Sequence, residues 1–145
     1  MRNFLSLLAC AVFPVAAAAQ SFEAVNHLKV VPISATDFEV IEDLGAGPRG
    51  IWCAAADYAV HRFGGTGTSR IYVKSPRGRS VTVSGRKGVI FTNSEASLGT
   101  APARSYSVTT DLPGVGLTVN HAIQFCRDDL IEPEDVLFPR PLLRN

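Results

Sequence analysis

The chain has few of the residues that would commit it to a particular chemistry. It contains three cysteines and three histidines in 145 residues, without a Cys-x-x-Cys pair and without histidines at a metal-binding spacing. We therefore expect neither a redox motif nor a histidine-based metal site. Its 14 basic residues nearly balance 13 acidic ones, which argues against a globally basic nucleic-acid binder.

Long apolar runs are also scarce: one extends from Phe4 to Val15, and no second apolar span follows it. It follows Arg2 and precedes a stretch of small residues, a pattern typical of a secretory signal peptide. It is too short to cross a bilayer, which takes about 20 helical residues. We therefore expect a signal peptide at 1–19, cleavage after Ala19, and a bacterial protein that is periplasmic or secreted, without a transmembrane segment.

An alternative for the same segment is a lipid anchor at Cys10, because residues 7–10 loosely resemble a lipobox. More apolar residues follow Cys10, however, where an acylated cysteine would begin a polar tether. The cleaved form is therefore favoured.

Cleavage would leave two cysteines, Cys53 and Cys126. An even pair in an oxidising compartment predicts a disulfide. This bridge would close a loop of about 73 residues, and the chain-entropy model gives such a loop about 4 kcal/mol. The alternative, a reactive thiol, is disfavoured because the chain has no Cys-x-x-Cys pair and both cysteines lie in apolar patterns typical of helices.

Periodic patterns predict a small sheet and two helices. Apolar residues at helical spacing predict a helix over 49–63, with Pro48 in its first turn and Gly64 at its C-cap. Thr118 is the predicted N-cap of a second helix. Alternating and β-branched residues predict strands at 25–32, 37–42, 69–75, 87–92 and 105–110, with a turn at 76–78 and an arm or third strand at 80–84.

Together these elements predict an α+β fold: a small antiparallel sheet with two helices packed on one face, cross-linked by Cys53–Cys126. We expect one domain over 20–131. The three prolines after Glu132 predict an extended tail at 132–145.

Residues 45–50 have the sequence G-x-G-x-x-G between a predicted strand and a predicted helix, the context of a dinucleotide-binding turn. Such a site needs an acidic residue about 20 positions further on. No Asp or Glu occurs between Asp57 and Glu95, and no alternating βαβ units follow. We therefore expect an ordinary strand-to-helix turn and no bound cofactor.

The same acid-free stretch contains seven basic residues. Such segregation can build a surface for phosphates, lipopolysaccharide or another anionic polymer. The predicted anion-binding residues are Arg77, Arg79, Arg86 and Lys87. The alternative is a solvated hairpin that protects a sheet edge and is neutralised by acidic residues near the C-terminus, namely Asp128, Asp129 and Glu132.

Asp57 and His61 lie four residues apart on the first predicted helix and hence on one face. Such a pair can perform acid–base chemistry if a third group, such as His121 or Ser84, lies nearby. Sequence spacing does not establish that convergence, so ordinary pairing on the helix surface is favoured.

The leading interpretation is a non-catalytic, envelope-associated binding or accessory module. Its expected partner is an anionic envelope polymer or another envelope protein, and no nucleic acid is expected. One alternative is a small hydrolase that uses His61 or His121, which requires a histidine, a carboxylate and a nucleophile to meet. Another is an inhibitor or partner-binding module that acts through a rigid, exposed arm at Ser75–Lys87.

Overall fold

The computed structural model describes residues 20–65 and 67–128. The predicted signal peptide and the predicted tail at 132–145 lie outside these ranges. The elements are β1 (Phe22–Glu23), β2 (Lys29–Pro32), β3 (Asp37–Ile41), α1 (Pro48–Phe63), β4 (Arg70–Arg79), β5 (Lys87–Thr92), the 3₁₀ helix η1 (Glu95–Ser97), β6 (Gly116–Thr118) and α2 (Val119–Asp128).

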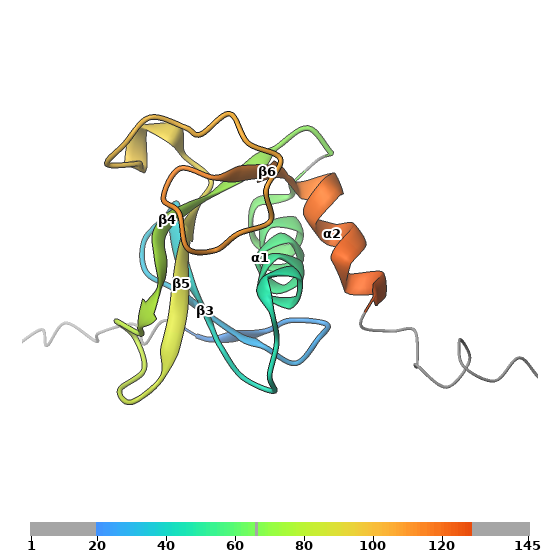
Figure 1. The fold of residues 1–145 in the computed structure, drawn as a ribbon. Helices are drawn as coiled ribbons and strands as arrows, with labels where there is room; N and C mark the ends of the chain where they lie inside the picture. The colour runs from blue at the N-terminus through green and yellow to red at the C-terminus, as the bar shows by residue number, and fades with distance from the viewer. Residues whose placement is uncertain (1–19, 66, 129–145) are drawn as a thin grey trace, which may run out of the picture.

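The six strands form one antiparallel sheet in the order β1-β2-β3-β5-β4-β6. The chain passes from β3 through α1 to β4, and β5 then returns between these two strands. Helix α1 lies along one face of the sheet, and α2 lies beside α1 on the same side (Figure 1). The α+β prediction is therefore confirmed.

The core lies between the sheet and α1. Phe38 pairs with Phe91 across β3 and β5, and both side chains are fully buried. The Tyr58 ring of α1 lies 4.6 Å from Phe38, and the Trp52 ring lies 4.9 Å from Phe91. Because side chains alternate along a strand, the neighbours of Phe38 in β3 face the opposite side of the sheet.

A disulfide joins Cys53 of α1 to Cys126 of α2, as predicted. Both cysteines are buried and their sequence separation is 73 residues. The bridge holds the second helix against the first, because α2 reaches the sheet mainly through its continuation from β6.

The predicted helix ends are confirmed. Pro48 occupies the first turn of α1, and Gly64 ends the helix with a φ of 61°, a left-handed conformation that glycine adopts easily. At the start of α2, the Thr118 hydroxyl accepts the backbone N–H of His121 at 3.3 Å, as an N-cap does.

The predicted turn at 76–78 and the predicted strand at 80–84 are wrong. Strand β4 continues through Pro76 to Arg79, with irregular register between Val73 and Gly78, and the chain turns back at 81–86. A bulged strand tolerates proline because the ladder is already interrupted there.

The strand predicted at 105–110 is also absent, because these residues form part of a long loop between η1 and β6. The indole N–H of Trp52 donates to the Val108 carbonyl at 2.9 Å and ties this loop to α1. Individual hydrogen bonds to other elements, such as that of the Arg77 N–H to the Thr110 carbonyl at 2.9 Å, thus hold this loop instead of a continuous ladder.

None of the helices in the described ranges has the length and apolar character needed to cross a membrane.

Candidate functional site

The face of the sheet opposite α1 holds a buried carboxylate. Glu39 of β3 is 1% exposed, and its carboxylate accepts hydrogen bonds from the Ser80 hydroxyl at 2.9 Å and the Thr82 hydroxyl at 2.5 Å. The backbone N–H groups of Val81 and Thr82 also donate to it, at 3.1 and 3.0 Å. We call these four bonds the Glu39 clamp; they attach the turn between β4 and β5 to the sheet.

Gly88 makes room for the clamp. A Cβ atom at Gly88 would lie 2.6 Å from a Glu39 oxygen, closer than real Cβ atoms approach other atoms. A side chain at this position would therefore displace the carboxylate. The buried position of the Glu39 carboxylate therefore depends on the glycine at position 88.

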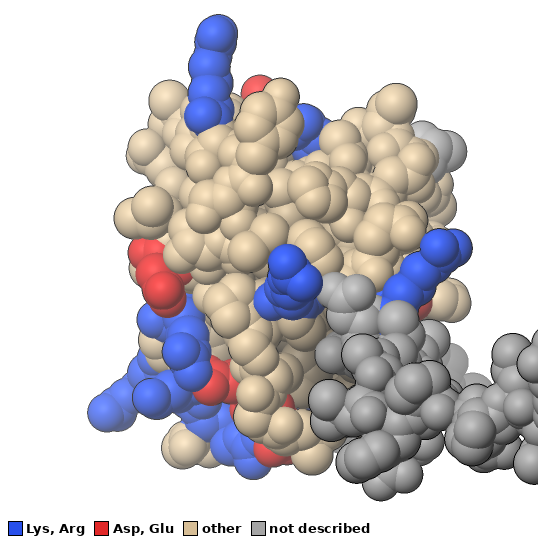
Figure 2. All heavy atoms as spheres, turned by 45° about the vertical axis from the view of Figure 1, so that its right-hand side comes forward, with Lys and Arg blue, Asp and Glu red and all other residues tan. Residues whose placement is uncertain are grey.

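The clamped turn borders a hollow of about 1030 Å³, which we call the hairpin hollow. The four predicted anion-binding residues line it, together with Asp111 and the turn itself. In Figure 2, Lys and Arg side chains gather at the lower left, where the hairpin ends, with acidic side chains among them. The structure thus brings Arg77, Arg79, Arg86 and Lys87 to one concave surface.

Two of these four residues are neutralised locally. Arg77 forms a two-pronged ion pair with Glu42, with one N–O distance of 2.6 Å. Arg86 pairs with Asp43 at 2.7 Å and donates to the Glu42 carbonyl at 3.0 Å. The Arg77 hydrogen bond holds the pKa of the Glu42 carboxyl below its usual value.

The partners of these arginines thus come from the residues that follow β3. The acidic residues proposed for this role in the alternative interpretation, Asp129 and Glu132, lie outside the described residues, and so does the side chain of Asp128.

The other two basic residues, Arg79 and Lys87, face each other. They are direct cross-strand partners at the end of the β4–β5 ladder. Neither side chain forms a hydrogen bond or an ion pair within 20–65 and 67–128, although Lys87 contributes to the lowered pKa of Glu42. Like charges directly opposite each other destabilise a sheet. In the hairpin hollow, Arg77 and Arg86 are thus paired with acidic side chains, whereas the side chains of Arg79 and Lys87 are not.

The predicted Asp57–His61 pair forms, with 3.3 Å between His61 Nδ1 and Asp57 Oδ1. The other Asp57 oxygen accepts the Val25 N–H at 2.8 Å, and the His61 ring lies 5.3 Å from Phe22. These contacts attach the first hairpin of the sheet to α1, which gives the pair a structural role.

The other groups proposed for acid–base chemistry lie elsewhere. The ring of His121 lies 5.4 Å from Phe125 on α2, and Ser84 lines the hairpin hollow. In the described part of the chain, no hydrogen bond or ion pair joins His61 to either of them. Within the described residues, the convergence that the hydrolase alternative requires is therefore not seen at His61.

The fold does bring together a serine and a lysine that the sequence pattern did not single out. Lys74 Nζ donates to Ser97 Oγ at 2.7 Å and to Asp37 Oδ2 at 2.5 Å, and Ser97 Oγ donates to Asp37 Oδ1 at 2.8 Å. Residues from β3, β4 and η1 meet here, and no local spacing links them.

This cluster ties β3, β4 and η1 together through hydrogen bonds between side chains. Burial raises the pKa of Asp37, but hydrogen bonds from Lys74, Ser97, Thr92 and Thr36 outweigh that effect and hold its pKa at about 2. Asp37 is therefore a poor base at neutral pH, and Lys74 acts as a hydrogen-bond donor to both partners.

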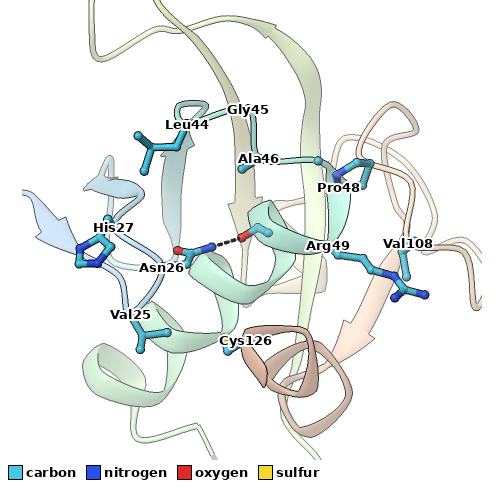
Figure 3. A pocket seen from close by; sticks show the side chains of 12 residues that line it. Val25, Asn26, His27, Leu44, Gly45, Ala46, Pro48, Arg49, Val108 and Cys126 are labelled. Atoms are coloured by element: carbon cyan, nitrogen blue, oxygen red, sulfur yellow. Dashed lines mark hydrogen bonds between the residues drawn. The ribbon is translucent and has the colours of Figure 1, made fainter. Parts of the chain in front are cut away.

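A further hollow, of about 710 Å³, lies where the glycine-rich turn enters α1 (Figure 3). The Asn26 amide donates to the Gly50 carbonyl at 2.8 Å, and the Arg49 guanidinium lies 5.6 Å from the Phe125 ring. Among the described residues, two that are not glycine have a left-handed backbone, namely His27 and Leu44, and both line this hollow. The G-x-G-x-x-G sequence at residues 45–50 thus forms the turn between β3 and α1 and the first residues of α1.

No group of three or more His, Cys, Asp or Glu residues that could hold a metal ion occurs within residues 20–65 and 67–128. Comparison with known protein families, with curated proteins and with solved structures finds no match for this chain. The site must therefore be interpreted from its own chemistry.

Proposed function

We propose that this protein is a non-catalytic binding module that holds an anionic polymer in the hairpin hollow. The observation that carries the proposal is the pairing of Arg79 with Lys87, two like charges placed opposite each other in a concave surface. A negatively charged group between them would offset their repulsion, because opposite charges within a few ångströms attract each other. Binding of an anion thus stabilises the arrangement.

The surroundings of this pair support binding without a large rearrangement. The Glu39 clamp attaches the turn to the sheet through four hydrogen bonds. A loop already held in its binding conformation loses less entropy when a ligand arrives. Arg77 and Arg86 are each engaged by an acidic residue, so we assign them a supporting role at the rim.

The disulfide supports the part of the proposal that concerns location. Disulfides persist in oxidising compartments and are rare where thiols are kept reduced. Cys53–Cys126 therefore favours an exported protein, as the N-terminal pattern predicts. Anionic polymers of the cell envelope are accessible to such a protein.

The test is a binding titration at low salt with heparin and with polyphosphate as probes, followed by fluorescence anisotropy of the labelled chains. The double variant Arg79→Ser/Lys87→Ser should bind at least about tenfold more weakly, which corresponds to about 1.4 kcal/mol. The matched control Arg62→Ser/Arg127→Ser removes the same charge from the helices. It should bind within about twofold of the parent.

Affinity should also fall steeply as salt rises, because exposed charges are screened over about 8–10 Å at physiological ionic strength. Two results would contradict the proposal: no binding of either polymer at low salt, or an equal loss in the test variant and the control. Equal losses would mean that net charge, and not the hairpin hollow, determines binding.

A second candidate is a partner-binding or inhibitory loop, and the Glu39 clamp favours it. Val81 lies in the clamped turn and is 68% exposed, so the arm at Ser75–Lys87 presents an apolar side chain on a fixed backbone. Trypsin is a suitable probe because the arm contains several arginines. An inhibitory loop should remain intact and lower the protease activity at equimolar ratio, whereas cleavage after Arg79 or Arg86 would exclude this role.

A further inference from the structure

A second basic hollow lies at the opposite end of β4. It has a volume of about 720 Å³ and is formed by the start of β4, η1 and the loop at 101–106. These segments lie together at the top of the molecule in Figure 1, away from the lower end of the β4–β5 hairpin. The volume falls within the range of about 300–1,000 Å³ that small-molecule sites occupy.

The floor of this hollow is built from fixed polar side chains. The buried Tyr72 hydroxyl donates to the Glu95 carboxylate, and Arg70 donates to the Gly116 carbonyl at 3.0 Å. Burial of Tyr72 and its bond to Glu95 both raise the pKa of the phenol, against a smaller opposing effect of Arg70. Tyr72 therefore remains an uncharged hydrogen-bonding group at neutral pH.

Gly116 of β6 fixes the position of the Tyr72 ring. A Cβ atom at this position would lie 2.3 Å from the ring, so the ring lies across β6 only because a side chain is absent there. The polar floor therefore depends on the close approach of two neighbouring strands, β4 and β6.

The rim presents an aromatic ring and a cation to solvent. Tyr106 is 90% exposed, and Arg104 forms no hydrogen bond or ion pair within the described ranges. Both side chains line the hollow. The backbone beside them is anchored, because the Ala103 N–H donates to the Gly114 carbonyl at 2.9 Å and Gly114 N–H donates to the Val73 carbonyl at 2.8 Å.

We infer that this hollow binds an acidic sugar unit, that is, a pyranose ring that carries a carboxylate. The exposed Tyr106 ring offers a rigid surface for the apolar face of the sugar, and its hydroxyl adds a polar contact. Arginine presents the planar fork of donors that matches a carboxylate, and the hollow contains Arg70 and Arg104. Glu95 supplies an acceptor for sugar hydroxyl groups.

The charge of the lining agrees with this class of ligand. Two arginines and one glutamate leave a single positive charge, which suits one carboxylate. This inference is independent of the proposed function, because Arg79 and Lys87 belong to a different hollow.

The test is an amide-shift NMR titration of the exported protein with trigalacturonic acid, with uncharged maltotriose as the control ligand. Shifts should concentrate at 70–72, 95 and 101–106 with the acidic trimer and be at least fivefold smaller with the neutral one. Tyr106→Ala and Arg104→Ser should each weaken binding about tenfold. Tyr106→Phe, which keeps the ring, should bind within about threefold of the parent.

The control variant Arg127→Ser removes an exposed arginine from α2 and should leave the titration unchanged. The inference would be overturned if the acidic trimer shifted mainly residues 77–87, if maltotriose bound equally well, or if Tyr106→Ala bound normally. Stronger binding of the tripeptide Gly-Gly-Phe than of the sugar would likewise overturn it, in favour of a peptide carboxylate site.

Discussion

The replacement Glu39→Gln tests the most unusual feature of the fold, a carboxylate buried against four donors. One of its oxygens accepts the Ser80 hydroxyl and two groups of Thr82, and the other accepts the Val81 N–H. Glutamine replaces one oxygen with an NH₂ group. In either orientation, at least one buried donor then faces another donor.

The expected cost follows from these contacts. A hydrogen bond to a charged group contributes about 1.5–3 kcal/mol, and a buried donor left without a partner costs about 1–3 kcal/mol. Glutamine keeps some of the bonds, so the free energy of unfolding should fall by about 2–4 kcal/mol. Most surface substitutions change it by less than about 0.5 kcal/mol.

Urea unfolding at pH 7 with the disulfide intact measures this change directly, because the midpoint falls in proportion to the lost free energy. Glu23→Gln is the matched control: that carboxylate is 72% exposed and contacts His27 on the surface, so its loss should be nearly neutral. A loss of less than about 1 kcal/mol for Glu39→Gln would refute the reasoning. It would mean that the turn at 81–86 does not depend on the Glu39 clamp.

Three further predictions concern other parts of the molecule. Thiol labelling of the denatured, unreduced protein should find neither Cys53 nor Cys126 reactive, and Cys126→Ser should lower the free energy of unfolding by about 2–5 kcal/mol. Leu44 is 71% exposed and has a φ of 56° in a turn with Gly45. Leu44→Asn, which creates the preferred Asn-Gly turn, should therefore raise the free energy of unfolding by about 0.5–1 kcal/mol, and a loss of stability would contradict the strain argument. The pKa of Asp37 is lowered from 3.8 to about 2, so its stabilising contribution is present above about pH 4 and is lost as the pH falls toward 2. Lys74→Met removes one of the hydrogen bonds that lower this pKa and should flatten this part of the profile of stability against pH. An unchanged profile would contradict the assignment.

Helix α1, the start of α2 and the disulfide could all be predicted because their signals are local or unique. Pro48 and Gly64 mark the ends of α1 through backbone preferences that act within one or two residues. The cysteine pairing needed no geometry, because cleavage at the predicted position would leave two cysteines and hence one pairing.

Strand boundaries and the site could not be predicted to the same degree. Strand β4 extends to Arg79 because β5 and the loop at Thr110 supply partners for its backbone, and these partners come from eight or more residues further along the chain. The expected turn at Pro76 failed for this reason: tertiary hydrogen bonding overrides local turn preference.

The basic character of the hairpin was evident in the sequence, since no acidic residue occurs between Asp57 and Glu95. Which of its charges are neutralised was not, because Glu42 lies 35 residues from Arg77 and only strand pairing brings them together. The Glu39 clamp likewise joins residues more than 40 positions apart. Composition and local periodicity determined the helices, the disulfide and the sign of the charge; the register of the sheet decided which charges remain unpaired, because it sets which side chains lie opposite each other.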